Sequence, residues 1–457
     1  MSLDTYLKPL VIIAFIIFGI GVLLRYALLW LGRSHKFDTR LASLSAEELD
    51  LHEKNLALGH SLSGRKNILN WPVPRLNSNF EFIQATYKEL NEDLQKKLTV
   101  QLSSEWLLDN FYLIESQVDS LRRELTKKSY LRLPVLATGP FKGYTRIFAI
   151  AADLVAHTDG NLDEASLKAS LMAYQSQIVL LERELWAFPI VIRLAMIENI
   201  RVVAEDIQRS HIQWHKANHI YDEWYKNKDQ DRDLALKTLM DHILGMKAVN
   251  SMLIDHLSFR LRRSGFNSAP VLRAIDTALI KAGTSLDEIT QKEHVQQSVN
   301  TVSMGNSITT LHTLATMDFA SLLEDVSLVD QILREDPDGI YTQMDANSRN
   351  HYRNTIEEIA AMAGVSEVHI ANDALELAQQ AALHRKNDDR ESPLRNVGHV
   401  GYYLIGDGVE ALRRKQGKSA SSYWRPFGAD NKFAKILYFT AIFLITMLIT
   451  ALAVWYP

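Results

Sequence analysis

The feature that most constrains the fold is a series of apolar residues at helical spacing within Ser103 to Arg201. In the first part of this stretch the apolar positions alternate between steps of four and three, which keeps them on one side of an α-helix. They are Leu107, Phe111, Ile114, Val118, Leu121 and Leu125. Charged residues such as Glu105 and Asp119 fall largely off this stripe. We therefore predict an amphipathic helix whose apolar side faces a core.

Further helices are predicted in the same stretch. After a break rich in proline and glycine at 134–143, a periodic run from Ile147 to Leu154 leads to the turn 157–160. Asn161 and Glu164 have the spacing of a capping box and predict the start of a third helix. Pro189 should start or kink a fourth helix, 190–203, because proline cannot donate a backbone hydrogen bond inside a helix.

Composition supports an all-α fold and excludes several classes of protein. The 457 residues are 47% hydrophobic, with 20 glycines and 11 prolines, a low share that favours long helices over turn-rich β structure. A net charge of -4 argues against a nucleic-acid binder. The absence of cysteine excludes disulfides, thiolate zinc sites and cysteine nucleophiles. No repeat is visible, so we expect an irregular multi-helix array.

Local signals outside this stretch place further helices. Ser45 and Glu48 form a capping box ahead of a short helix, and the string 71–77 should resist regular structure because of Pro72 and Pro74. Helical spacing recurs at 234–256, 269–282, 347–363 and 365–385. Gly364 should end the helix before it.

Two apolar segments, 10–31 and 436–456, predict transmembrane helices, since about 20 apolar residues cross a bilayer. A cleaved signal peptide is the alternative for the first, but no small-residue cleavage site follows it. Lys and Arg gather on the inner flanks of both segments and predict that the region between them is cytoplasmic. We expect an anchor at 10–31, a juxtamembrane linker with short helices at 32–95, a helical region at 96–417 and a second span at 436–456.

Several long strings resemble the amino-terminal region of the cyclic β-1,2-glucan synthases, large bacterial inner-membrane glycosyltransferases. They are EWLLDNFYLIE, GPFKGYTRIFAIAADLVAHTDG and ELWAFPIVIRLAMIENIR, followed by NSITTLHTLATMDF, VSLVDQILREDPDGIYTQMDANSRNHYRNTIEEIA and HVGYYLIGDGVEAL. They run in this order over roughly 103–417. The resemblance implies an enzyme that polymerises glucose from UDP-glucose and closes the ring.

The resemblance also implies that the catalytic machinery lies in modules beyond this chain, where a divalent cation would act together with UDP-glucose. No D-x-D in a β-α-β context, P-loop or nucleophile elbow occurs here. We expect no cofactor in this chain and a membrane-anchored helical scaffold in the bacterial inner membrane. Its partners would be the lipid bilayer and the transferase module of the same or a neighbouring polypeptide. The alternatives are a free-standing membrane-tethered interaction protein, or an independent hydrolase or metal enzyme.

Five residues are candidates for contact with glucan or with the transferase module: Trp106, Asp109, His157, Asp159 and Trp186. His157 and Asp159 could bind sugar hydroxyls or a cation, or could serve the turn by hydrogen bonding to backbone. Asp109 could bond to a neighbouring helix or to glucan. The glycines of 398–404 suggest close backbone packing, and Arg146 is expected to be an exposed docking residue.

His211, His215 and His219 stand four residues apart, a spacing that places metal ligands on one side of a helix. Trp214, Tyr221, Trp224 and Tyr225 favour instead a packed, partly exposed amphipathic helix. We expect no metal site here, with a metal enzyme based on these histidines as the alternative.

Overall fold

The computed structural model describes residues 40–64, 70–96, 101–227, 250–264, 268–387 and 397–417. The chain divides into two compact units, Met1–Val326 and Ser327–Pro457. This division lies inside the predicted helical region 96–417.

The described residues form 17 α-helices, and the all-α prediction is confirmed. Unit 1 contains α2 (Ala46–Gly59), α3 (Pro72–Gln95), α4 (Leu102–Glu124), α5 (Lys127–Tyr130), α6 (Arg146–His157), α7 (Glu164–Gln175), α8 (Glu182–Leu185), α9 (Phe188–Asn227), α11 (Ser251–Arg263), α12 (Ala269–Lys281), α13 (Leu286–Thr316) and α14 (Phe319–Val326). Unit 2 contains α15 (Leu328–Leu333), the 3₁₀ helix η1 (Tyr341–Gln343), α16 (Ala346–Ala363), α17 (Glu367–Asn387), α18 (Val400–Leu404) and α19 (Val409–Lys415). A two-stranded antiparallel sheet pairs β1 (Leu62–Ser63) with β2 (Val135–Leu136).

None of the helices in the described ranges combines the length and the apolar character that a membrane span requires. Both predicted spans, 10–31 and 436–456, fall outside the described residues.

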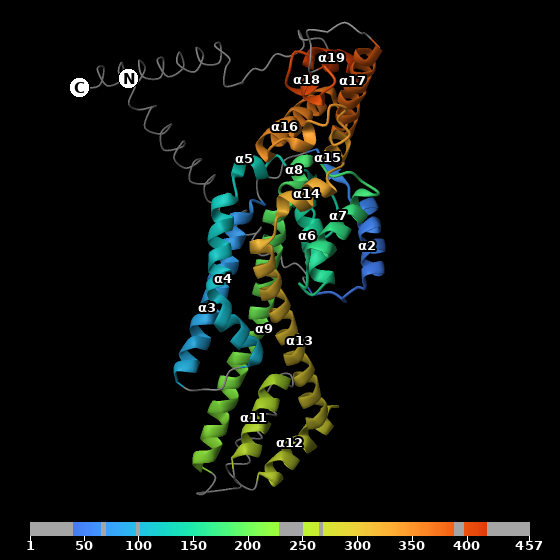
Figure 1. Ribbon diagram of the computed structural model, residues 1–457. Helices are drawn as coiled ribbons and strands as arrows, with labels where there is room; N and C mark the ends of the chain where they lie inside the picture. The colour runs from blue at the N-terminus through green and yellow to red at the C-terminus, as the bar shows by residue number, and fades with distance from the viewer. Residues whose placement is uncertain are drawn as a thin grey trace, which may run out of the picture. The chain divides into compact units, whose positions relative to one another are not determined.

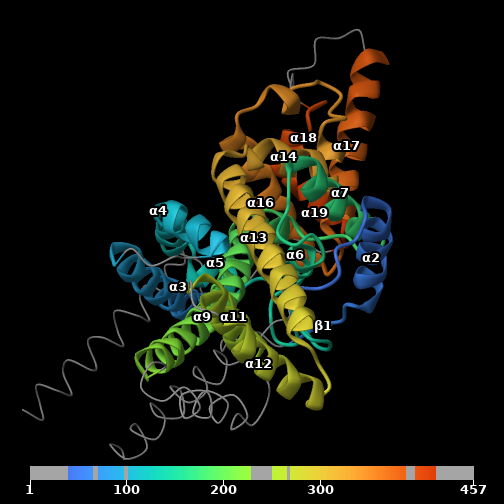
Figure 2. The ribbon, with the colours of Figure 1, turned by 90° about the horizontal axis from the view of Figure 1, so that it is seen from below.

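Unit 1 is organised around α9, a helix of 40 residues. In Figures 1 and 2, α3 and α4 lie on one side of α9, while α2, α6 and α7 lie on the other. Helix α13 packs against both α4 and α9, and α11 packs against the second half of α9. Pro189 is the second residue of α9, so the predicted start is confirmed, but the helix continues far beyond Val203.

The apolar stripe of α4 faces the core as predicted. Leu107, Ile114, Val118 and Leu121 are fully buried, and Leu125 is nearly so. Phe111 is only partly buried and stacks on Tyr87, with ring centroids 4.1 Å apart. Local periodicity therefore predicted which side of α4 is buried.

Two local predictions were wrong. The string 71–77 is not irregular: Trp71 is the N-cap of α3, and the two prolines fall in its first turn. The first turn tolerates proline because its N–H groups have no partner within the helix. The cap of α7 is Asp163 with Ser166, not Asn161 with Glu164. By contrast, the Ser45–Glu48 capping box is present.

Unit 2 has its own hydrophobic core, and several buried polar side chains are paired beside it. The Arg353 guanidinium donates to Asp330 at 2.8 and 3.0 Å, and Asp330 also accepts from the Tyr341 hydroxyl. Nearby, His399 lies between the Asp336 carboxylate at 2.7 Å and the Tyr352 hydroxyl at 2.8 Å. A Cβ added at Gly401 would lie 1.9 Å from that hydroxyl, so the close packing predicted for 398–404 is internal to the unit.

Candidate metal centre and adjoining cavity

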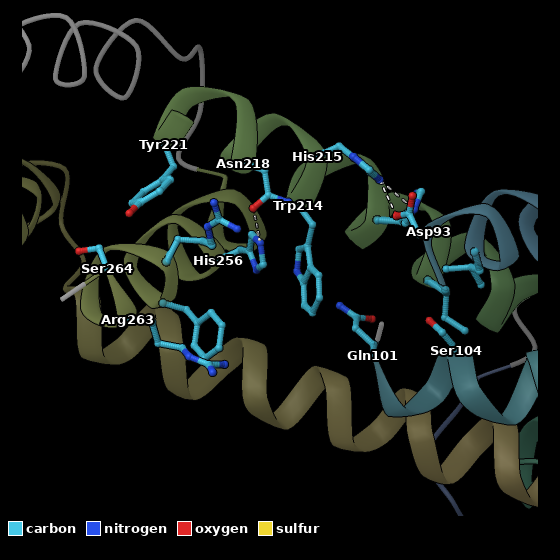
Figure 3. A pocket seen from close by; sticks show the side chains of 15 residues that line it. Asp93, Gln101, Ser104, Trp214, His215, Asn218, Tyr221, His256, Arg263 and Ser264 are labelled. Atoms are coloured by element: carbon cyan, nitrogen blue, oxygen red, sulfur yellow. Dashed lines mark hydrogen bonds and ion pairs between the residues drawn. The ribbon is translucent and has the colours of Figure 1, made fainter. Parts of the chain in front are cut away.

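Three side chains that could hold a metal ion converge in unit 1. The Nε2 atoms of His211 and His215 each lie 2.7 Å from Asp93 Oδ2, and the two Nε2 atoms are 3.1 Å apart. Figure 3 shows Asp93 and His215 pointing toward one another across the gap between α3 and α9. We call Asp93, His211 and His215 the His–Asp cluster.

The positions of these residues follow from helix geometry. His211 and His215 are one turn apart on α9, so their side chains leave the same side of the helix. Asp93 lies in the last turn of α3, which packs against α9. Asp93 is buried, His211 partly buried and His215 exposed, which places the cluster at the protein surface. The cluster is thus held by two packed helices and remains open to solvent on one side.

The environment keeps Asp93 ionised. Burial alone would raise the pKa of this carboxyl, but the hydrogen bonds from His211 and His215 outweigh burial and bring the pKa below its ordinary value. A carboxylate that is charged near neutral pH can accept two N–H groups or bind a cation.

A cavity of about 330 Å³ adjoins the cluster. All three cluster residues line the cavity, together with Gln101 and Ser104 from the start of α4 and with residues of α11. Aromatic rings and guanidinium groups form much of the remaining wall: Trp214, Tyr221, Phe259, Arg260 and Arg263. This combination of apolar surface with a few polar groups is typical of a ligand site.

His256 of α11 stabilises one wall of this cavity. Its ring stacks on Trp214 with centroids 4.3 Å apart, and its Nε2 lies 3.0 Å from Asn218 Oδ1. Burial, aided by the positive charge of Arg260, lowers the pKa of His256 to about 4. The imidazole is therefore neutral at pH 7 and donates to Asn218, an interaction drawn in Figure 3.

The structure brings together only part of the predicted histidine row. His219 is exposed and does not join the cluster. Asp93 was not predicted as a candidate, because 118 residues separate it from His211 and no local pattern marks it. The spacing of His211 and His215 was a real signal for a shared side of α9, but the third member of the cluster comes from the packing of α3 on α9.

The five predicted contact residues are dispersed over unit 1, and none of them lines the cavity. Trp106 is 37% exposed, and its indole covers Gly305 of α13, where an added Cβ would lie 3.3 Å from Cε2. Asp109 is exposed one turn further along α4. Trp186 follows α8, packs partly against the core and donates to Glu182 at 3.3 Å.

His157 and Asp159 have structural partners. His157 Nδ1 lies 3.1 Å from the backbone oxygen of Ala42, which matches the backbone hydrogen bond predicted as its alternative. Asp159 adopts φ 50° in the turn after α6 and accepts a hydrogen bond from Ser303 of α13. His157 also belongs to a second group with His52 and Asp153, in which His52 Nε2 lies 2.6 Å from Asp153 Oδ2.

Arg146 is not the exposed residue that was predicted. It is 3% exposed and forms a buried ion pair with Glu184, with Nε 2.9 Å from Oε1 and a second bond to Oε2. Arg146 is the first residue of α6, and its side chain extends inward to Glu184 of α8. There its positive charge balances the buried negative charge of Glu184.

The chain is related in sequence to a protein of known function. It is 31% identical over 349 residues, 76% of its length, to the cyclic β-(1,2)-glucan synthase NdvB of Rhizobium meliloti (strain 1021). The chain is homologous to a part of a cyclic β-1,2-glucan synthase. The resemblance predicted from the sequence strings is confirmed. The chain spans 12% of the length of NdvB, and no model of a protein family matches it.

Proposed function

We propose that the chain is a membrane-anchored helical scaffold segment of a cyclic β-1,2-glucan synthase. In this proposal modules outside the chain transfer glucose from UDP-glucose, using a divalent cation of their own, and the helices hold those modules in place. The observation that carries the proposal is the extent of the homology: three quarters of this chain corresponds to only 12% of NdvB. In NdvB the matching segment is one small part of a much larger protein, which supports a role for this chain as one component of such an enzyme.

The described architecture supports a scaffold role. Long packed helices such as α4, α9 and α13 present extended side-chain surfaces. This helical architecture differs from doubly wound folds, in which the carboxyl ends of parallel strands bind nucleotides.

Helix α4 carries the exposed surface that best suits docking. Leu102, Trp106 and Tyr112 are exposed on it, and Tyr112 is 69% exposed. Asp109 is exposed between the two aromatic residues. Exposed aromatic residues are typical of protein interfaces. We propose that this surface of α4, which includes the predicted contact residues Trp106 and Asp109, docks on the transferase module of the same or a neighbouring polypeptide.

The proposed location is the bacterial inner membrane. It rests on the apolar segments 10–31 and 436–456 and on the Lys and Arg residues beside them. In this arrangement the bilayer is a partner of the chain and the central helical region is cytoplasmic.

The test compares two double variants in membranes that carry the chain together with its transferase module. Leu102→Glu with Tyr112→Glu changes the docking surface of α4 at its two most exposed apolar residues and leaves Trp106, which packs on Gly305 of α13, in place. Leu51→Glu with Leu58→Glu is the matched control, because both leucines are exposed on α2, at 61% and 66%. Glucan synthesis is measured per inserted molecule, with UDP-glucose affinity and co-purification of the transferase module measured in parallel.

The α4 variant should lose most glucan synthesis and most co-purification at unchanged abundance and unchanged UDP-glucose affinity. The α2 variant should match the wild type. Normal synthesis with normal co-purification in the α4 variant would refute the docking surface. Failure of the chain to associate with any transferase would favour a free-standing interaction protein.

A further inference from the structure

The His–Asp cluster is crowded if it is held by hydrogen bonds alone. The three atoms, two imidazole nitrogens and one carboxylate oxygen, form a nearly equilateral triangle with sides of 2.7, 2.7 and 3.1 Å. If both nitrogens were protonated, two hydrogens directed at one oxygen would be pressed against each other. If one nitrogen were bare, its lone pair would face the carboxylate charge. A single cation in place of the hydrogens removes both conflicts.

The spacing of the triangle suits a bound metal ion. Ligand atoms that each lie about 2.0–2.2 Å from one ion are roughly 3 Å apart at octahedral angles and roughly 3.4 Å apart at tetrahedral angles, so small outward movements of the three atoms would admit an ion. Imidazole nitrogens also bind metals through the neutral ring, whose Nε2 lone pair is free when Nδ1 carries the proton.

The donor set selects the class of metal. Two imidazole nitrogens with one carboxylate oxygen suit first-row transition ions such as Zn²⁺, Co²⁺ and Fe²⁺. Mg²⁺ and Ca²⁺ prefer sites made entirely of oxygen. The cluster therefore differs in kind from the oxygen-rich cation site that a sugar-nucleotide transferase needs.

We propose that Asp93, His211 and His215 bind one divalent first-row transition metal ion, with Zn²⁺ as the representative ion. The three protein ligands leave at least one coordination position for water or another small ligand. That position is reached from the 330 Å³ cavity, because all three residues line it.

A second observation points to a ligand in this cavity. Gln101 lines it, and its Nε2 atom is buried without a hydrogen-bond partner among the described residues. In Figure 3 the Gln101 side chain lies beside Trp214, between the two sides of the cavity. A buried amide without a partner is costly, and an acceptor atom of a small ligand in the cavity would satisfy it.

The test uses the purified full chain in detergent, with an affinity tag that contains no histidine. The chain is treated with EDTA, freed of the chelator and titrated with Zn²⁺ in a calorimeter. We expect one site with micromolar or tighter affinity and no competition by millimolar Mg²⁺. Titration with Co²⁺ should give visible absorption bands characteristic of a mixed nitrogen and oxygen ligand set.

Variants assign the site to the cluster. His215→Ala should weaken Zn²⁺ binding by at least about 100-fold, because loss of even a supporting residue around a metal costs roughly 10–100-fold. His211→Gln should do the same. The matched control is His219→Ala, which removes an exposed histidine of the same helix and should leave the affinity within about threefold.

Each other outcome would overturn the site. Absence of saturable Zn²⁺ binding to the wild type would refute it directly, with no variant needed. Equal binding by His215→Ala and wild type would show that the ion lies elsewhere. Loss of binding in His157→Ala instead would place the ion at the second histidine group. Circular dichroism in EDTA checks that each variant is folded. The measurement does not involve glucan synthesis, so it stands or falls apart from the scaffold role.

Discussion

Two regions of unit 1 contain similar polar residues but use them differently. Between α2, α6, α7 and α8 lies a polar layer of Glu53, His60, Arg146, Ser170, Tyr174 and Glu184, paired as Glu53–Ser170, His60–Tyr174 and Arg146–Glu184. The His–Asp cluster and its cavity lie between α3, α9 and α11. The hydrogen bonds of the polar layer hold helices together, whereas the three residues of the cluster also line an open cavity. Residue type alone thus does not distinguish a structural group from a binding site.

The largest effect is expected in the polar layer. Arg146→Glu would place a second carboxylate against buried Glu184 and should cost about 3–5 kcal/mol in the free energy of unfolding. Urea unfolding followed by circular dichroism measures it. Lys142→Glu, an exposed charge reversal four residues earlier, is the control and should stay within about 0.5 kcal/mol. Equal stability of the two variants would contradict the buried ion pair.

Arg146 also shows what the sequence could and could not predict. The stripe of α4 and the start of α9 were predictable because the spacing of residues within one helix decides which side is buried. The burial of Arg146 depends on Glu184, which lies 38 residues away. The cluster likewise joins two histidines with a local pattern to Asp93, which has none. Pairings between distant segments come from tertiary packing, and a single sequence does not encode them in any short pattern.

The next effect concerns the rise of pH from about 4.5 to 8. Burial, only partly offset by the hydrogen bond from Ser170, raises the pKa of Glu53 to about 8 from 4.5. The folded chain therefore holds a proton that the unfolded chain releases, and this stabilisation, complete below pH 4.5, is lost as pH rises through 8. The full shift corresponds to roughly 5 kcal/mol, and relaxation and water penetration around the carboxyl should reduce the measured loss to about 3 kcal/mol. Glu53→Gln should remove this pH dependence in urea unfolding, and an unchanged slope would disprove the assignment.

The cavity region should respond to pH in the opposite direction. His256 has a pKa of about 4 when folded, against 6.5 for a free imidazole. Between these values the unfolded chain binds a proton that the folded chain excludes, so stability falls as pH falls from 6.5 to 4. The full shift corresponds to roughly 3 kcal/mol, and screening by solvent in the cavity should reduce the measured loss to about 2 kcal/mol. His256→Gln in EDTA should flatten this acid limb, whereas His219→Gln should retain it.

The smallest effects separate the two histidine groups most sharply. In EDTA, His157→Ala should cost about 1 kcal/mol, because it removes the hydrogen bond to the backbone of Ala42. His215→Ala should change stability by less than about 0.5 kcal/mol, since its side chain is 46% exposed and the loss of its hydrogen bond to Asp93 is offset by relief of the crowding against His211. With Zn²⁺ present the order of the two variants should reverse. The wild type and His157→Ala should gain thermal stability, because an ion that binds only the folded chain stabilises it. His215→Ala should not gain thermal stability. Thermal unfolding of the three proteins, with and without Zn²⁺, measures both orders. A Zn²⁺-dependent gain in His215→Ala equal to that of the wild type would show that the His–Asp cluster does not bind the ion.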